Sequence, residues 1–311
     1  MSQHFDTLDP VFVPGPGGKV IVGYDGSPTS VAALDWGAAE ALVRSSVLHA
    51  MMCSTPSDAT DFYEAGARRR GELHAAVVDL TMRFPGLHVE STATIGDPRD
   101  ALSEHAEPAD LLVVGASTGG VVKRLLLGSV PRDAARRSPC PVVVVHGRTT
   151  TKPDRHTIDR IVVGIDGSIA ADTAIQWTCS ESGFHGADIV LVHAWERGSR
   201  EEAQVLLDRA VERCRHLTPN PVEGRLVAGS PTDALVAASR DADLVAIGSR
   251  GRSGFATMLF GSVALAVAEL AACPIAITHP QRHLASGDHK SSHPSPQTPS
   301  PTSPHPKGQH S

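Results

Sequence analysis

The feature that most constrains the fold of this chain is an internal repeat. The segment VIVGYDGS at residues 20–27 returns as IVVGIDGS at residues 161–168. Further segments recur in the same order, among them DLLVVG from Asp110 and DLVAIG from Asp243. Such self-similarity is the mark of a duplicated unit. We therefore predict two similar domains, in agreement with a length of 311 residues, because one domain usually takes about 150.

The spacing between the two copies changes along the chain. It is 141 residues from Asp25 to Asp166, 144 from His49 to His193, and 133 from Gly96 onward. We expect the second copy to be shorter between its second and third strands, in a connecting segment, where deletions are best tolerated.

Each copy alternates short apolar runs with helical patterns, which is typical of βα units and a parallel sheet. In the first copy we expect strands at residues 19–24, 47–52, 88–94, 110–115 and 141–146. Ser27 and Asp97 are expected to cap the helices that follow, each with a proline next in sequence. We predict an α/β protein of two tandem doubly wound domains, each a five-stranded parallel sheet with helices on both faces and flavodoxin-like layering.

Composition places the domain boundaries. We expect an N-terminal extension at 1–18, a first domain at 19–147, a polar linker at 148–157, a second domain at 158–281 and a tail at 282–311. The tail is rich in Ser, Pro, Thr and His and cannot bury enough apolar surface, so we predict that it is disordered.

The two domains should pack as a pseudo-twofold pair through their apolar last strands, residues 142–145 and 275–277. The sequence leaves open whether whole chains also form a homodimer. Charge and hydropathy argue against nucleic acid and membranes as partners, whereas a protein partner stays unknown. The net charge is -6 without a basic stripe, which argues against nucleic acid. No apolar run reaches the roughly 18 residues of a membrane span, and the start lacks a secretion leader, so we expect a cytoplasmic protein.

The five cysteines form no CxxC pair and are interpreted as reduced, mostly buried thiols. Cys53 follows a predicted strand and is a candidate for a reactive thiol, but its neighbours in sequence supply no activating charge.

A ligand site is predicted where the strands end. Open parallel sheets bind ligands outside the carboxyl ends of their strands, near the point where strand order reverses. The first strand delivers Asp25 or Asp166 to this edge, the second delivers a His-Ala pair, and the fourth runs into a glycine-rich loop.

In the second copy this loop spans residues 248–254, and Gly261-Ser262 follow at a helix start. Such a loop suits phosphate, because glycines let backbone N–H groups turn inward and a helix N-terminus adds donors and a favourable dipole. Arg250 and Arg252 either add charge or point to solvent. One glycine-rich loop alone is a weak signal, since turns need glycine too, but its combination with the matched aspartate is more specific.

With these motifs, residues 19–146 and 158–280 resemble the universal stress protein family in its tandem-domain form. In members that bind ATP, the pattern Gly-x2-Gly-x9-Gly followed by Ser or Thr holds the phosphates and ribose. The aspartate that ends the first strand lies at the base of the site, and the residue after the second-strand His lies near adenine. The resemblance implies a stress-response regulator that binds ATP, with or without Mg²⁺.

The resemblance implies nucleotide-binding residues in both copies. In the first they are Gly23, Asp25, Ala50, Gly115, Ala116, Ser117, Thr118, Gly119, Gly120, Gly128, Ser129 and Val130. In the second they are Gly164, Asp166, Ala194, Gly248, Ser249, Arg250, Gly251, Arg252, Ser253, Gly254, Gly261, Ser262 and Val263. No catalytic residue and no metal ligand of the protein is predicted.

The two copies differ at one glycine of the pattern, since Thr118 stands where the second copy has Gly251. If that position needs a left-handed backbone, a β-branched residue should cost about 1–2 kcal/mol. That corresponds to roughly tenfold in affinity. We therefore expect the second domain to bind ATP more tightly than the first.

Other interpretations remain. One is a protein-interaction scaffold with vestigial nucleotide sites, which Thr118 favours in the first copy and the complete glycine pattern of the second copy disfavours. Slow ATP hydrolysis is another, since it is compatible with a carboxylate beside bound nucleotide. A specialised phosphoryl-transfer enzyme is disfavoured because no Walker A motif is present, and a dinucleotide-dependent oxidoreductase because DGS replaces GxGxxG after the first strand. We interpret His49 and His193 as packing or hydrogen-bonding residues, and Asp100 and Asp233 as parts of helix starts.

Overall fold

The computed structural model describes residues 18–55, 59–106, 109–116, 127–146, 157–196, 198–251 and 261–280. The predicted N-terminal extension, linker and tail lie almost wholly outside these ranges, as does the interior of both glycine-rich loops. The domain boundaries therefore stay predictions.

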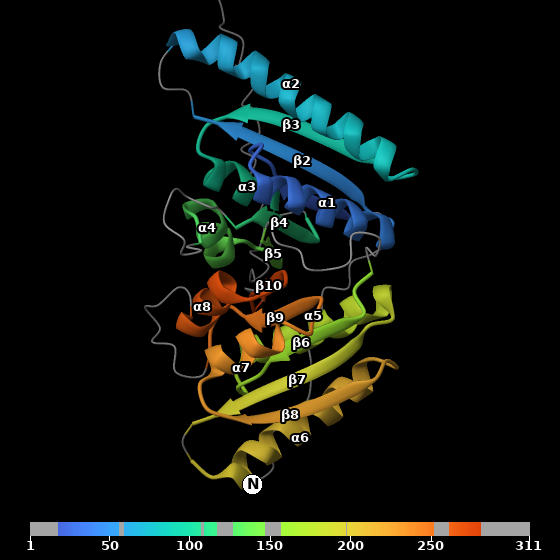
Figure 1. The fold of residues 1–311 in the computed structure, drawn as a ribbon, viewed down its shortest axis with the longest axis vertical. Helices are drawn as coiled ribbons and strands as arrows, with labels where there is room; N and C mark the ends of the chain where they lie inside the picture. The colour runs from blue at the N-terminus through green and yellow to red at the C-terminus, as the bar shows by residue number, and fades with distance from the viewer. Residues whose placement is uncertain are drawn as a thin grey trace, which may run out of the picture. The chain divides into compact units, whose positions relative to one another are not determined.

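The first half contains five strands and four helices in alternation (Figure 1). They are β1 (Lys19–Gly23), α1 (Pro28–Val43), β2 (Val47–Ser54), α2 (Ala59–Arg83), β3 (Val89–Ile95), α3 (Pro98–Ala106), β4 (Leu111–Gly115), α4 (Ser129–Arg137) and β5 (Val142–Val145). The five predicted strands are confirmed, with ends shifted by at most two residues. The predicted caps are also present: Ser27 accepts a hydrogen bond from the N–H of Ser30, and Asp97 accepts one from the N–H of Arg99.

The second half repeats the same order of elements. They are β6 (Arg160–Gly164), α5 (Ile169–His185), β7 (Asp188–Trp195), α6 (Arg200–Leu217), β8 (Val222–Ala228), α7 (Pro231–Ala238), β9 (Leu244–Gly248), α8 (Ser262–Leu270) and β10 (Ile275–Thr278). The shortening predicted for this copy falls in its second helix, since α6 has 18 residues and α2 has 25.

The ten strands form one sheet in the order β3-β2-β1-β4-β5-β10-β9-β6-β7-β8. Neighbours within each half are parallel, and strand order reverses between β1 and β4 and between β6 and β9. The predicted pairing of the last strands is confirmed: β5 and β10 pair antiparallel, with Val143 opposite Ala276. The two predicted sheets are therefore joined into one, and every residue of both joining strands is buried.

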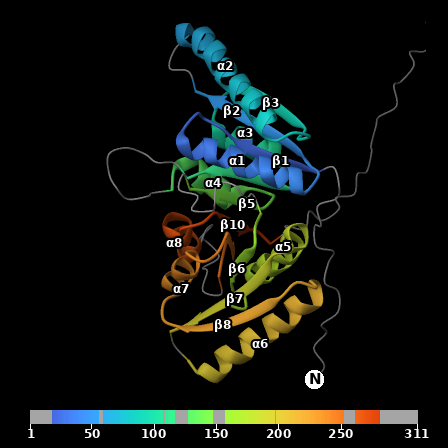
Figure 2. The ribbon, with the colours of Figure 1, turned by 45° about the vertical axis from the view of Figure 1, so that its right-hand side comes forward.

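Helices cover both faces of this sheet (Figures 1 and 2). An apolar core cluster lies on each face. One contains side chains of α1, α2, α5 and α6, and the other contains side chains of α3, α4, α7 and α8. Successive strand residues alternate between them, as Val20, Ile21 and Val22 do in β1. This arrangement confirms the predicted doubly wound α/β fold.

The strand register corrects one pairing predicted from the repeat. Lys19 lies opposite Val47 in the first half, and Arg160 lies opposite Asp188 in the second, so the second strands keep the 141-residue offset of the first strands. The equivalent of His193 is therefore Met52, and His49 corresponds to an apolar residue of β7. The predicted 144-residue offset was wrong because a His-Ala pair occurs by coincidence in both strands.

A cluster of buried charges links α1 to α5. Arg44 forms ion pairs with both Glu40 and Glu181. His185 Nε2 lies 3.1 Å from Glu40 Oε2 and 3.3 Å from Glu181 Oε1. All four side chains are at most 2% exposed. Glu40 and Glu181 occupy equivalent positions of the two halves, as do Arg44 and His185, so each half supplies one carboxylate and one base.

Burial and charge set the protonation of this cluster. Burial raises the pKa of Glu181 to about 7. Burial also acts on Glu40, but Arg44 and His185 outweigh it and hold the Glu40 pKa well below its usual value. Burial alone would lower the pKa of His185, yet its bonds to the two carboxylates raise it to about 9.

Two histidines join the halves at the ends of β5 and β10. His146 Nε2 donates to the carbonyl of Ala268 in α8 at 2.8 Å, and His279 Nε2 donates to the carbonyl of Ala135 in α4 at 2.8 Å. The two bonds are equivalent, because each links the end of a last strand to the last helix of the other half. Burial lowers the pKa of both histidines, so both are neutral near pH 7.

Candidate functional site

The candidate site of the second half begins where β6 ends. Asp166 Oδ1 accepts a hydrogen bond from the backbone N–H of Ser168 at 3.0 Å. His193 Nδ1 donates to the carbonyl of Ile165 at 2.8 Å and so holds the chain just before Asp166. Ser168 then caps α5, since its hydroxyl accepts from the N–H of Ala171 at 3.2 Å.

Three glycines come together with Asp166 at this edge. A Cβ on Gly248 would lie 2.5 Å from a backbone carbon of Ala170, so β9 can approach α5 only with glycine there. A Cβ on Gly251 would lie 2.6 Å from Asp166 Oδ2. The position of a Cβ on Gly261 is within 4.0 Å of the Gly251 nitrogen. The structure therefore places Gly251 against the predicted aspartate, with Gly261 beside Gly251 and Gly248 packed on the start of α5.

Backbone hydrogen bonds fix both ends of the glycine-rich loop. Ser249 N–H donates to the carbonyl of Thr278 at 2.8 Å, and Gly261 N–H donates to the carbonyl of Ser249 at 2.9 Å. The Ser168 hydroxyl donates to the carbonyl of Arg250 at 3.4 Å. The start of α8 is thereby held beside the end of β9.

The first turn of α8 differs from most helix starts of this chain. Ser27, Ser168, Ser199 and Ser230 each cap a helix through the side chain. Helix α8 begins after Gly261, which makes no side-chain capping bond. Backbone N–H groups of a first turn that lack such a cap are donors for an anion, and the helix dipole favours negative charge at the same point.

The first half repeats part of this arrangement. A Cβ on Gly115 would lie 2.6 Å from a backbone carbon of Thr29, and α4 begins after Gly128 without a side-chain cap. Asp25 Oδ1 accepts from the N–H of Ser27 at 2.9 Å. Burial would raise the pKa of Asp25, but hydrogen bonds from Ser27 and Ser30 hold it below its usual value.

The corrected register changes the residues expected near a ligand in the first half. Ala50 is 0% exposed and belongs to the core, so its side chain cannot contact a ligand. The residue equivalent to Ala194 is Cys53, whose thiol donates to the carbonyl of Gly96 at 3.2 Å. His49 Nε2 lies 2.8 Å from Thr92 Oγ1, in agreement with the hydrogen-bonding role predicted for it.

The structural reason for glycine at position 251 also differs from the predicted one. Its backbone is not left-handed, unlike that of Gly167 with a φ of 77°. Glycine instead permits a close approach to Asp166, and a side chain at position 251 would move the Asp166 carboxylate from its present place. The predicted site residues Ser117, Thr118, Gly119, Gly120, Arg252, Ser253 and Gly254 lie outside the described residues.

A carboxylate of the second half reaches the first half's glycine-rich loop. Glu269 Oε1 lies 3.4 Å from the backbone nitrogen of Leu127, which precedes Gly128, and 3.3 Å from Arg132 Nη2. The equivalent of Glu269 in the first half is Arg136, so the contact is not reciprocated. Sequence analysis missed this contact because it depends on how the halves pack.

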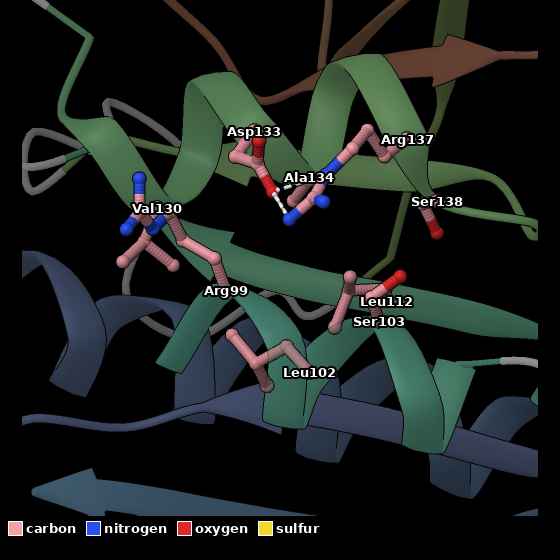
Figure 3. Close-up of a pocket in the computed structure, with 9 residues that line it drawn as sticks. All are labelled: Arg99, Leu102, Ser103, Leu112, Val130, Asp133, Ala134, Arg137 and Ser138. Atoms are coloured by element: carbon pink, nitrogen blue, oxygen red, sulfur yellow. Dashed lines mark hydrogen bonds and ion pairs between the residues drawn. The ribbon is translucent and has the colours of Figure 1, made fainter. Parts of the chain in front are cut away.

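A small pocket lies between α3 and α4 of the first half (Figure 3). Its arginines are already paired: Arg137 Nε donates to Asp133 at 2.8 Å, and Arg99 Nε donates to Asp97 at 2.9 Å. Of the predicted site residues only Val130 lines this pocket. The pocket therefore does not coincide with the candidate site.

The described residues contain one group with the spacing of metal ligands, namely Glu40, Glu181 and His185. Arg44 already supplies a cation to both carboxylates there, which leaves little reason for an ion to bind. Among the described residues, no helix is long and apolar enough to cross a membrane.

This chain is similar to known proteins in sequence and in fold. The sequence model of the universal stress protein family matches residues 18–146 and 157–279. A universal stress protein of Mycobacterium tuberculosis is 31% identical over 283 residues, covering 83% of this chain and 96% of the relative. A second from the same organism is 30% identical over 285 residues, covering 83% and 95%. The crystal structure of a universal stress protein from Archaeoglobus fulgidus has a TM-score of 0.67 at 19% identity, and covers 84% of this chain and 98% of that one.

Proposed function

This chain belongs to the universal stress protein family, and from that premise we propose that it binds ATP, chiefly in its second half, as a nucleotide-dependent regulator of the stress response. The observation that carries the proposal is the close approach of Gly251 to Asp166, with Gly261 beside Gly251 at the uncapped start of α8. The carboxyl ends of β6 and β9, between which strand order reverses, are where a sheet of this type binds ligands.

The chemistry of these groups favours a nucleotide over a simple anion. Backbone N–H groups of the loop and of the first turn of α8 suit phosphate oxygens. A carboxylate repels phosphate, but it accepts hydrogen bonds from sugar hydroxyls and suits a magnesium ion that neutralises a polyphosphate. Asp166 beside Gly251 would therefore interact with the sugar or the metal, while the loop and helix hold the phosphates.

Binding rather than turnover is the main activity in this proposal. His193, the histidine beside the site, uses Nδ1 to hold the carbonyl of Ile165, which is a positioning role. Slow hydrolysis of bound ATP remains compatible with the carboxylate of Asp166. A regulator of this kind would act through the presence of the nucleotide, not through a product.

We assign the first half a weaker site or a scaffold role. Thr118 replaces the glycine whose Cβ position is 2.6 Å from the aspartate in the second half. Met52 occupies the position equivalent to His193. A methionine side chain has no N–H group to donate to the carbonyl at the end of the first strand, as His193 does. Glu269 accepts a hydrogen bond from the N–H of Leu127 and pairs with Arg132, so it occupies a donor and offsets a cation that would otherwise favour an anion at the start of α4.

Nucleotide released from purified protein tests this function. We would denature the protein in acid, quantify ATP per chain by chromatography, and repeat the measurement after dialysis against ATP and magnesium. Asp166→Ala should lose most of the bound nucleotide, whereas the matched Asp25→Ala should retain it. If wild-type protein carries no ATP either as purified or after dialysis, the scaffold role is the better description. If the two variants lose equal amounts of nucleotide, the proposed difference in ATP affinity between the halves is wrong.

A further inference from the structure

Two cysteines of the second half lie in contact within the core. Cys179 is in the middle of α5 and Cys214 is near the end of α6, and their Sγ atoms are 3.2 Å apart. Both thiols are free and nearly inaccessible, at 5% and 0% exposure. We propose that Cys179 and Cys214 are a redox modification site, in which a peroxide converts the two thiols into a reversible disulfide between α5 and α6.

The surrounding contacts hold the two thiols in place. One helical turn beyond Cys179, Ser182 Oγ lies 3.2 Å from Thr218 Oγ1. Asn220 Nδ2 donates to the carbonyl of Ser182 at 2.7 Å. These bonds fix the end of α6 against α5, so the sulfur atoms need to approach by only about 1 Å to reach a bonding distance.

The electrostatics of the pair give the two thiols different roles. The hydrogen bond between the two sulfur atoms lowers the pKa of Cys214, burial opposes that change, and Arg213 and Arg215 lower it further. The same hydrogen bond, together with burial, raises the pKa of Cys179. Cys214 is thus the thiol that becomes a nucleophilic thiolate, and Cys179 is the thiol that resolves the intermediate.

The reaction balances with a peroxide as the oxidant. The Cys214 thiolate attacks one peroxide oxygen, the O–O bond breaks, and the leaving oxygen takes a proton to give an alcohol, or water from hydrogen peroxide. The Cys179 sulfur then attacks the Cys214 sulfenic acid, the S–O bond breaks, and water leaves with the Cys179 proton. Two thiols lose two electrons in total, and the peroxide gains them. A dithiol reductant reverses the step.

The other cysteines are an internal control. Burial raises the pKa of Cys140 to about 11 and that of Cys273 to about 12, and the nearby Asp110 and Asp243 add to the rise. In the first half the positions of the pair are held by Ala38 and Thr81, so only the second half can form this link. Reversible disulfides in a cell interior are typical of redox sensing.

Peptide mapping of the intact wild-type chain tests the proposal and needs no variant to fold. After exposure to hydrogen peroxide, blocking of remaining thiols and digestion without reductant, we expect a linked peptide pair containing Cys179 and Cys214, absent after treatment with dithiothreitol. Cys140 and Cys273 should be recovered as blocked thiols. Recovery of Cys179 and Cys214 as blocked thiols, or as stable sulfinic acids, would overturn the proposal.

Two variants separate the roles of the thiols. Cys179→Ala should leave a sulfenic acid on Cys214 that dimedone traps, whereas Cys214→Ala should slow the oxidation of Cys179 at least tenfold, on the order expected for loss of the thiolate. In wild-type protein the oxidised form should melt several degrees above the reduced form, because the link restricts the unfolded chain. Trapping of Cys179 rather than Cys214 would reverse the assigned roles, and equal melting temperatures would contradict a bridge between the two helices.

Discussion

The two halves of this protein share their strands and helices but differ in the side chains at the carboxyl ends of those strands. In the second half Asp166, His193 and Gly251 form a connected arrangement around the end of β6. The positions of His193 and Gly251 hold Met52 and Thr118 in the first half. Buried strand positions have kept their apolar pattern in both copies because the sheet requires it, whereas positions at the edge have been free to diverge.

A similar asymmetry appears in the buried charge cluster that links the halves. The carboxylates are the same in both, Glu40 and Glu181, but the first half supplies the permanent charge of Arg44 and the second supplies the titratable His185. The first half therefore contributes a cation at every physiological pH, and the second contributes one that depends on pH.

The largest expected effect comes from removing that permanent charge. Arg44→Ala leaves two buried carboxylates with only His185, so we expect the free energy of unfolding to fall by about 3–5 kcal/mol. Urea denaturation followed by circular dichroism measures it. Arg83→Ala, which breaks the exposed ion pairs of Arg83 with Asp35 and Asp79, is the control and should change stability by less than about 1 kcal/mol. Equal losses in the two variants would mean that the cluster does not stabilise the joint between the halves.

Because His185 can lose its proton, we predict that the protein loses stability at alkaline pH. The folded-state pKa of His185 is raised to about 9 from 6.5, so its contribution is complete below pH 6.5 and is lost as pH rises through 9. A shift of this size corresponds to about 3 kcal/mol. Melting temperature measured from pH 6.5 to 9.5 should fall in the wild type, and the fall should be clearly smaller in His185→Gln. An unchanged slope in the variant would assign the pH dependence to other groups.

Exchange of the glycine at the candidate site tests the asymmetry in binding. Gly251→Thr places a Cβ 2.6 Å from Asp166 Oδ2, which should displace the carboxylate. Loss of one hydrogen bond to that carboxylate costs about 1.5 kcal/mol, so ATP binding should weaken by roughly tenfold. The matched Thr118→Gly variant should strengthen the first site. Isothermal titration calorimetry of both variants measures the two sites. A Gly251→Thr protein with wild-type affinity would show that the close approach to Asp166 does not matter for the nucleotide.

The smallest effect is expected at the two histidines that join β5 and β10 to the opposite halves. Burial lowers the pKa of His146 and of His279, so their contribution is present above pH 6.5 and is lost as pH falls below that value. His146→Ala should cost about 1 kcal/mol at pH 7, because the Ala268 carbonyl loses its partner. The double variant should show a shallower fall of melting temperature between pH 7 and 5. This acid dependence is opposite in direction to that of His185, so one pH series distinguishes the two joints.

Much of the fold could be predicted because strands, caps and the repeat are local properties of sequence. The strand positions of the first half, the cap at Ser27 and the pairing of β5 with β10 followed from apolar runs and from residues with one structural preference. The equivalence of His49 and His193 could not be judged this way, because a two-residue match does not set a strand register. Hydrogen bonds to β1 and β6 set it instead.

The parts of the site that sequence analysis missed depend on distances between segments far apart in the chain. Thr118 was recognised as the departure, but the reason, a close approach of Gly251 to Asp166, required coordinates. Glu269 at Leu127 and the contact of Cys179 with Cys214 each join helices that the sequence places far apart. No local sequence pattern predicts such contacts.

The antiparallel pairing of β5 with β10 also decides how this protein can grow into larger assemblies. Each half pairs its most apolar edge strand with that of the other half, so the outer strands of the sheet are β3 and β8. These outer strands carry Glu90, Glu223 and Arg225, held in ion pairs near the surface. Charged outer strands discourage the addition of further strands. We therefore expect that two chains would meet through helices, and that the sheet does not extend into a fibre.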